Sequence, residues 1–125
     1  MKSPHSGLTR ILYAARFSWK GFKSTWKHEE AFRQEVVMFI FLVPVAFWIG
    51  ENAYERAILI AVLMIVLLVE LLNSAIESVV DRVGEDYHKL SGRAKDQGSA
   101  AVFLSFFIAI LVWGGFIISK IMGGL

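Results

Sequence analysis

Three long apolar stretches alternate with polar segments along the chain, at residues 36–50, 57–72 and 99–119. A bilayer core about 30 Å thick needs about 20 helical residues, so the third stretch suffices alone and the other two need residues from their flanks. Residues 57–69 carry no polar side chain, so this segment has no face for water in a soluble helical bundle. We therefore predict three transmembrane helices, at 31–50, 55–80 with a cytoplasmic extension, and 99–119.

An amphipathic pattern precedes these stretches, over residues 6–27. Apolar side chains recur there at steps of three and four, and basic side chains recur one position further round the helix. The apolar stripe is Leu8, Ile11, Leu12, Ala15, Trp19, Phe22 and Trp26, and the basic stripe is Arg16, Lys20, Lys23 and Lys27. This pattern is typical of a helix lying in the membrane interface on anionic headgroups. Alternatively, the apolar stripe packs on the transmembrane helices, and both descriptions can hold.

The positions of Gly and Pro predict where the first two helices bend. Neither residue interrupts positions 22–43, so we expect the interfacial helix to bend into the first transmembrane helix near residues 27–30. Pro44 is expected to kink that helix without ending it, because a neighbouring helix can satisfy the carbonyl group that it frees.

Composition narrows the class of protein further. The chain has 125 residues, of which 56% are hydrophobic and only 19% charged. A soluble domain this small would expose too much surface for so few charges. The absence of Cys excludes a disulfide scaffold and a Cys-ligated metal site, and a formal net charge of +2 gives no reason to expect a nucleic-acid partner. We expect one membrane domain, residues 1–125, with the lipid bilayer as its main solvent.

The basic residues predict the orientation. All but Arg56 and Lys120 either precede the first apolar stretch or lie between the second and third. The larger group is Lys2, Arg10, Arg16, Lys20, Lys23, Lys27, Arg33, Arg82, Lys89, Arg93 and Lys95. Cytoplasmic loops carry such an excess, so the N-terminus and a loop at 81–98 are predicted in the cytoplasm and the C-terminus outside.

The second span carries an unusual polar stripe. Glu70, Asn73, Ser74, Glu77 and Asp81 fall within an arc of about 100° on one helix face. Glu70 directly follows the apolar run 57–69, near the depth of a lipid's glycerol group. A carboxylate there is costly and is a candidate functional group, in particular a general base. Alternatively, Glu70 caps the hydrophobic segment or pairs with Arg or Lys of a neighbouring chain.

Two further carboxylates are expected at a common depth. Glu77 lies two helical turns, about 10 Å, beyond Glu70. Glu29 precedes the first apolar stretch by seven residues, which places it at a similar depth in an antiparallel neighbour. Mg²⁺ favours one or two protein carboxylates together with phosphate and water oxygens, so the pair suits a Mg²⁺–phosphate site. The alternative is a solvated acidic rim.

The segment 84–98 contains glycines together with Arg93 and Lys95, which could wrap phosphates. It lacks the P-loop pattern and the protein-kinase motifs, so composition alone equally describes an ordinary helix-entry loop.

Two segments carry a family resemblance. Residues 69–82 read VELLNSAIESVVDR and residues 87–96 read YHKLSGRAKD, and both resemble the prokaryotic diacylglycerol kinase family. AFRQE at 31–35 and SWKG at 18–21 match as well, so the resemblance covers nearly the whole chain. It implies an all-α homotrimer of the cell inner membrane with a periplasmic C-terminus. The implied enzyme is an ATP-dependent kinase that moves the γ-phosphoryl group of Mg-ATP to the hydroxyl of 1,2-diacylglycerol, giving phosphatidic acid.

The resemblance also implies residue roles. Glu70 would be the general base supported by Asn73, and Glu29 and Glu77 would hold the Mg²⁺ on the nucleotide. ATP would be met by Arg10, Phe17, Glu29, Glu77, Asp86, Tyr87, His88, Lys95 and Asp96. The lipid would be met by Arg10, Ala14, Trp19, Ala31, Glu35, Glu70, Ser99 and Trp113. Arg16 and Phe17 depart from the Gly-Tyr of familiar members, so a hydrogen bond from a tyrosine hydroxyl is missing here.

Two other functions remain open at this point. Undecaprenol is an acceptor for relatives in other bacteria, and the sequence does not resolve the acceptor pocket. A non-catalytic membrane subunit or proton-relay element would also carry a titrating Glu70.

Overall fold

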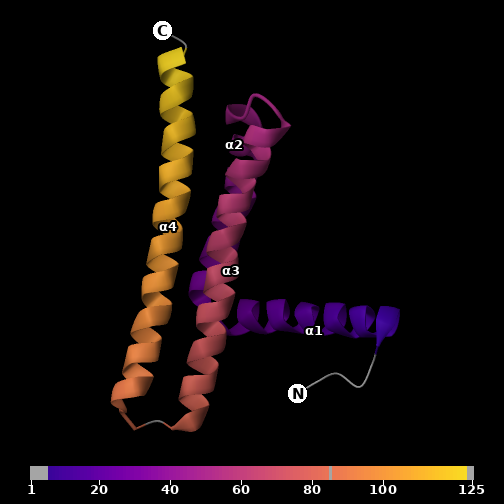
Figure 1. The fold of residues 1–125 in the computed structure, drawn as a ribbon, viewed down its shortest axis with the longest axis vertical. Coiled ribbons are helices and arrows are strands. Elements are labelled where there is room, and N and C mark those ends of the chain that lie inside the picture. The colour runs from indigo at the N-terminus through magenta and orange to yellow at the C-terminus, as the bar shows by residue number, and fades with distance from the viewer. Residues whose placement is uncertain (1–5, 85, 124–125) are drawn as a thin grey trace.

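The computed structural model describes residues 6–84 and 86–123, and every regular element in that part of the chain is a helix. The helices are α1 (Gly7–His28), α2 (Glu30–Ile49), α3 (Ala53–Val83) and α4 (Lys89–Gly123). The last three lie side by side, while α1 leaves the bundle crosswise (Figure 1). Each of the last three is long and apolar enough to cross a membrane, as the sequence predicted. Lys2 lies outside the described residues.

The predicted loop at 81–98 is mostly helical. Helix α3 continues to Val83 and α4 begins at Lys89, so only residues 84 and 86–88 of the described connection are non-helical. The hydropathy pattern shows only where the apolar side chains end. The helices continue beyond that point through polar residues, and they stop where the helical backbone is interrupted. His88 helps to start α4, because its Nδ1 accepts a hydrogen bond from the Leu90 backbone N–H at 3.1 Å.

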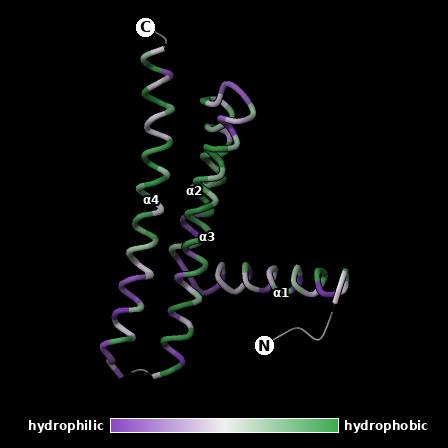
Figure 2. The backbone as a smooth tube through the Cα atoms, in the orientation of Figure 1, coloured by the Kyte–Doolittle hydropathy of each residue, from purple (hydrophilic) through white to green (hydrophobic). Residues whose placement is uncertain are grey.

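The two long helices extend beyond a bilayer core. With 31 residues in α3 and 35 in α4, they span about 46 and 52 Å, against about 30 Å for the hydrocarbon layer. Their middle parts are apolar, and hydrophilic residues gather where the two helices are connected (Figure 2). The polar stripe of α3 therefore lies in the half of the helix that approaches this connection.

Helices α1 and α2 meet at Glu29, within the range expected for the bend. Glu29 has extended backbone angles (φ −115°, ψ 108°) between two helices. The last carbonyl groups of α1 are satisfied from α2, because Arg33 Nη1 donates to the carbonyl oxygens of Trp26 at 2.8 Å and Lys27 at 3.2 Å. Pro44 lies inside α2 without ending it, also as expected.

Arg56 and Lys120, the two basic residues outside the predicted cytoplasmic group, lie at the end of the bundle opposite the connection of α3 and α4. Arg56 Nε donates to the Phe47 carbonyl oxygen at 3.3 Å, and Lys120 Nζ donates to the Trp48 carbonyl oxygen at 3.0 Å. These cations satisfy the C-terminal carbonyl groups of α2, which favour positive charge. The turn needs Gly50, because a Cβ atom there would lie 2.6 Å from the Cγ atom of Arg56.

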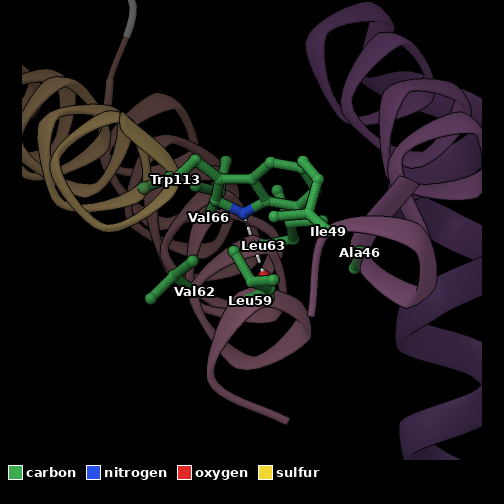
Figure 3. Close-up of a cluster of buried hydrophobic side chains, with 8 residues drawn as sticks. Ala46, Ile49, Leu59, Val62, Leu63, Val66 and Trp113 are labelled. Carbon is green, nitrogen blue, oxygen red and sulfur yellow. Dashed lines mark hydrogen bonds between the residues drawn. The ribbon is translucent and has the colours of Figure 1, made fainter. Parts of the chain in front are cut away.

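The hydrophobic core lies between the two ends of the helix bundle and contains Trp113 of α4 (Figure 3). Its indole Nε1 donates a hydrogen bond to the Leu59 carbonyl oxygen of α3 at 3.0 Å. The other core residues are Ala46, Ile49, Leu59, Val62, Leu63, Val66 and Ala109. A buried indole needs a partner for its N–H group, and here that partner fixes the register of α4 against α3.

Replacing Trp113 by Phe is expected to lower the free energy of unfolding by about 1 kcal/mol, within the range measured for hydrogen bonds between transmembrane helices. A phenyl ring takes the place of the indole, so most of the apolar contact is kept. Unfolding in mixed detergent micelles measures the change, with Trp48→Phe as the control because Trp48 is exposed. Equal stability of the two variants would contradict a structural role for the indole hydrogen bond.

Candidate functional site

The polar stripe of α3 continues the side of the helix that packs against its neighbours. Glu70 (5% exposed), Asn73 and Ser74 are buried, and they follow Val66 at helical spacing. Glu70 forms no ion pair with any Lys or Arg of residues 6–84 and 86–123. Within one chain, the Glu70 carboxyl group is thus buried, with no neutralising cation among the described residues.

A second carboxyl group, from α2, meets Glu70. Glu35 is 7% exposed, and its side chain lies within hydrogen-bonding reach of that of Glu70. Its Oε2 atom is buried and has no hydrogen-bond partner among the described residues. An unpartnered buried acceptor costs free energy, so the site favours a ligand that brings a hydrogen-bond donor.

An apolar groove of about 280 Å³ begins at Glu35. It runs between α2, α3 and α4 as far as Trp113, so the structure brings together two of the residues expected at the lipid. The other lining residues are Met38, Phe39, Leu42, Leu63, Val66, Phe106, Ala109 and Ile110. Apolar walls with one carboxyl group at the end suit an elongated apolar molecule that carries a polar head.

Asn73 is held between Glu77 and Gly98. Its Nδ2 donates to Glu77 Oε1 at 3.4 Å, while its Oδ1 is buried without a partner. The Asn73 side chain occupies the space where Gly98 of α4 would carry a Cβ atom. Gly98 therefore belongs to a close contact between two helices, a packing role that the sequence did not suggest.

Glu29 lies at the height of the polar stripe, as its place in the sequence predicted. It lines a hollow of about 290 Å³ between α1 and α3 that also includes Ser74 and Ser78. Glu70 is close enough to both Glu29 and Glu77 for their charges to act on it.

No three potential metal ligands gather in residues 6–84 and 86–123. Two carboxylates are nevertheless a suitable protein contribution for Mg²⁺, whose remaining oxygens come from phosphate and water. The donor set therefore fits a metal that arrives with a phosphate substrate.

A second hollow, of about 500 Å³, lies at the connection of α3 and α4. Asp86, Tyr87, His88 and Lys95, all expected at the nucleotide, line it together. Lys95 Nζ is 2.7 Å from Asp81 Oδ1, a partner that the sequence did not suggest. Asp96 and Ser99 lie on exposed faces of α4.

The remaining expected residues are not brought to the carboxylates. None of residues 7–28 is buried, and α1 extends away from the bundle (Figure 1). Its exposed candidates are Arg10, Ala14, Phe17 and Trp19. The ring of Phe17 packs near Tyr13 and under Lys20, and nothing in this geometry explains why Phe replaces Tyr here. Ala31 is exposed at the start of α2.

Residues 16–117 match the family model for prokaryotic diacylglycerol kinase. The chain is 50% identical over 113 residues to the diacylglycerol kinase of Escherichia coli (strain K12), covering 90% of this chain and 93% of that protein. It is 46% identical over 110 residues to that of Haemophilus influenzae, covering 88% and 93%. It is 34% identical over 113 residues to that of Helicobacter pylori (strain ATCC 700392 / 26695), covering 90% and 88%.

Proposed function

The chain belongs to the prokaryotic diacylglycerol kinase family, and we propose that it transfers the γ-phosphoryl group of Mg-ATP to the free hydroxyl of 1,2-diacylglycerol, giving phosphatidic acid. One observation carries this proposal. An apolar groove ends at the unpartnered carboxyl oxygen of Glu35, directly beside the buried Glu70. Acyl chains suit the groove, and the glycerol hydroxyl suits the carboxyl groups.

On the acceptor side, Glu70 is the proposed general base. It takes the proton of the lipid hydroxyl as that oxygen forms its bond to the γ-phosphorus and the bond from phosphorus to the β–γ bridging oxygen breaks, releasing ADP. Phosphoryl transfer depends mainly on positioning and on neutralising charge. Glu35 orients the hydroxyl, Asn73 stands between the base and Glu77, and the groove excludes water from the alcohol.

On the donor side, we assign the nucleotide to the hollow at the connection of α3 and α4. Lys95 supplies positive charge to the phosphates, while Asp86, Tyr87, His88 and Asp96 are proposed to hold the rest of ATP. Glu29 and Glu77 would hold the Mg²⁺, which neutralises charge on the phosphates. Glu29 lines one hollow with Ser74 and Ser78, which lie on either side of Glu77 along α3. This common position along the bundle supports the pairing of Glu29 with Glu77.

We propose a homotrimer in the cell inner membrane, with the connection of α3 and α4 in the cytoplasm, the C-terminus in the periplasm and α1 on the cytoplasmic surface. Exposed small and apolar residues on α3 alternate at steps of three and four, the spacing of helices that pack together. They are Ile58, Ala61, Ile65, Leu68, Leu72, Ala75 and Val79. Because the N-terminal part of α1 extends away from the carboxylates of its own chain, Arg10, Ala14, Phe17 and Trp19 are assigned to a site shared between copies.

Purified protein in mixed micelles with ATP and diacylglycerol is expected to form phosphatidic acid only when Mg²⁺ is present. Absence of any ATP-dependent phospholipid product would reject the kinase proposal in favour of a non-catalytic subunit or proton relay. A parallel reaction with undecaprenol tests the other acceptor. Faster phosphorylation of undecaprenol than of diacylglycerol would reassign the groove to that alcohol.

Replacing Glu77 by Gln is expected to raise the apparent KM for Mg-ATP by about tenfold, the scale of one lost interaction with a charged group. The KM for diacylglycerol should stay unchanged. Glu30→Gln serves as a control, because Glu30 is exposed one residue from Glu29 and lines neither hollow. If the Mg²⁺ dependence of Glu77→Gln equals that of the unmodified protein, Glu77 does not hold the metal.

A further inference from the structure

The ion pair between Asp81 and Lys95 joins the two helices that frame the nucleotide hollow. Asp81 lies on the last turns of α3 and Lys95 near the start of α4, and Nζ approaches Oδ1 to 2.7 Å. Both side chains line the hollow with Tyr87 and His88. Among residues 6–84 and 86–123, the structure shows this one ion pair.

The pair leaves Lys95 able to bind a second acceptor. An ammonium group has three N–H donors, of which Asp81 engages one, so two remain for phosphate oxygens. The Lys95 side chain is 44% exposed, and a free lysine stem in water loses conformational freedom when it is ordered on a ligand. Part of that loss has already occurred when Asp81 fixes the Nζ atom at the wall of the hollow.

Glu77 is the other carboxylate whose charge acts on Lys95. It lies one helical turn before Asp81 and is the proposed metal ligand. Without Asp81, Lys95 would have Glu77 as its nearest opposite charge and would compete there with Mg²⁺. The geometry thus gives Asp81 two effects of the same sign, since it orders the lysine and keeps it away from the metal ligand.

We propose that Asp81 is a positioning residue, which holds Lys95 in place for the nucleotide phosphates before they bind. This inference rests on the proposed kinase function, in which Lys95 meets ATP. The competing possibility is that the charge of Asp81 mainly repels the phosphates. The two possibilities predict opposite changes in nucleotide affinity when Asp81 is removed.

The test measures binding of the non-hydrolysable analogue AMPPNP with Mg²⁺ to the full-length protein in detergent micelles, by titration calorimetry. Asp81→Ala is expected to raise the Kd by about two- to fivefold, the scale of an exposed ion pair. Asp81→Asn keeps an oxygen that accepts a hydrogen bond, so its effect should be smaller. The KM for diacylglycerol should not change, whereas general damage to the fold would alter the KM for both substrates.

A double-mutant cycle with Lys95→Met identifies the route of the effect. If Asp81 acts through Lys95, adding Asp81→Ala to Lys95→Met changes the Kd for AMPPNP by no further factor. An equal increase in both backgrounds would overturn the inference, as would tighter binding by Asp81→Ala or Asp81→Asn alone. Failure of the unmodified protein to bind AMPPNP would instead refute the proposed function, so the two failures are distinguishable.

Discussion

Replacing Glu70 by Gln is expected to reduce phosphorylation of diacylglycerol by at least about a hundredfold, the usual scale of a lost general base. Gln has nearly the same size, so the packing of α3 against α2 is preserved. Its amide cannot take the proton of the lipid hydroxyl. The contact with Glu35 and the unpartnered oxygen beside it make this position sensitive to that one change.

The variant should keep its fold and its nucleotide site. Binding of AMPPNP and the oligomeric state in micelles should match those of the unmodified protein, because Glu70 lines neither the nucleotide hollow nor the exposed face of α3. Glu55→Gln, at the opposite end of the same helix, is the matched control and should retain full turnover. Near-normal turnover by Glu70→Gln would remove Glu70 from the role of base.

Gly98→Ala is the second substitution with a large expected effect. A methyl group at this position would overlap Asn73 Oδ1, so the asparagine must turn away from Glu77 or α4 must move away from α3. Overpacking of this kind costs about 1–3 kcal/mol of stability. Because Asn73 lies between the proposed base and the proposed metal ligand, we expect turnover to fall by about ten- to a hundredfold, the effect of a displacement of about 1 Å at an active site.

Three measurements separate packing from catalysis at this contact. Gly115→Ala, on the same helix and with no atom within 4 Å of the added Cβ, should leave stability and turnover unchanged. Combining Gly98→Ala with Asn73→Ala should recover stability, since the overlap is removed, but not turnover. Full stability and turnover in Gly98→Ala alone would contradict the close approach of α4 to Asn73.

Helices were predictable from the sequence because the signals that specify them are local. The apolar stretches gave three long helices, the stripes at 6–27 gave α1, and the bend falls at Glu29 as expected. Local hydropathy misjudged the segment 81–98, where polar residues continue two helices and were interpreted as a loop.

Contacts between helices were not predictable in the same way. Glu70 and Glu77 stood out because a carboxylate after an apolar run is costly. The family resemblance placed both Glu35 and Glu70 at the lipid, but periodicity gives no sign that the two carboxyl groups would meet, since they lie on different helices. Asp81 belonged to the stripe, but its pairing with Lys95 depends on how α3 and α4 are joined.

The amino-acid sequence by itself determined that lipid is the main surrounding of this protein, where its helices lie and which helix face carries the carboxylates. It could do so because periodicity and charge distribution are properties of neighbouring residues. Only the tertiary structure decided that Glu35 and Trp113 line one groove, that Glu35 meets Glu70, that Asn73 needs Gly98, and that Lys95 is held by Asp81. Those contacts depend on the rotation and height of one helix against another. The rotation and height of each helix are set jointly by many residues far apart in the chain, so no local sequence pattern predicts these contacts.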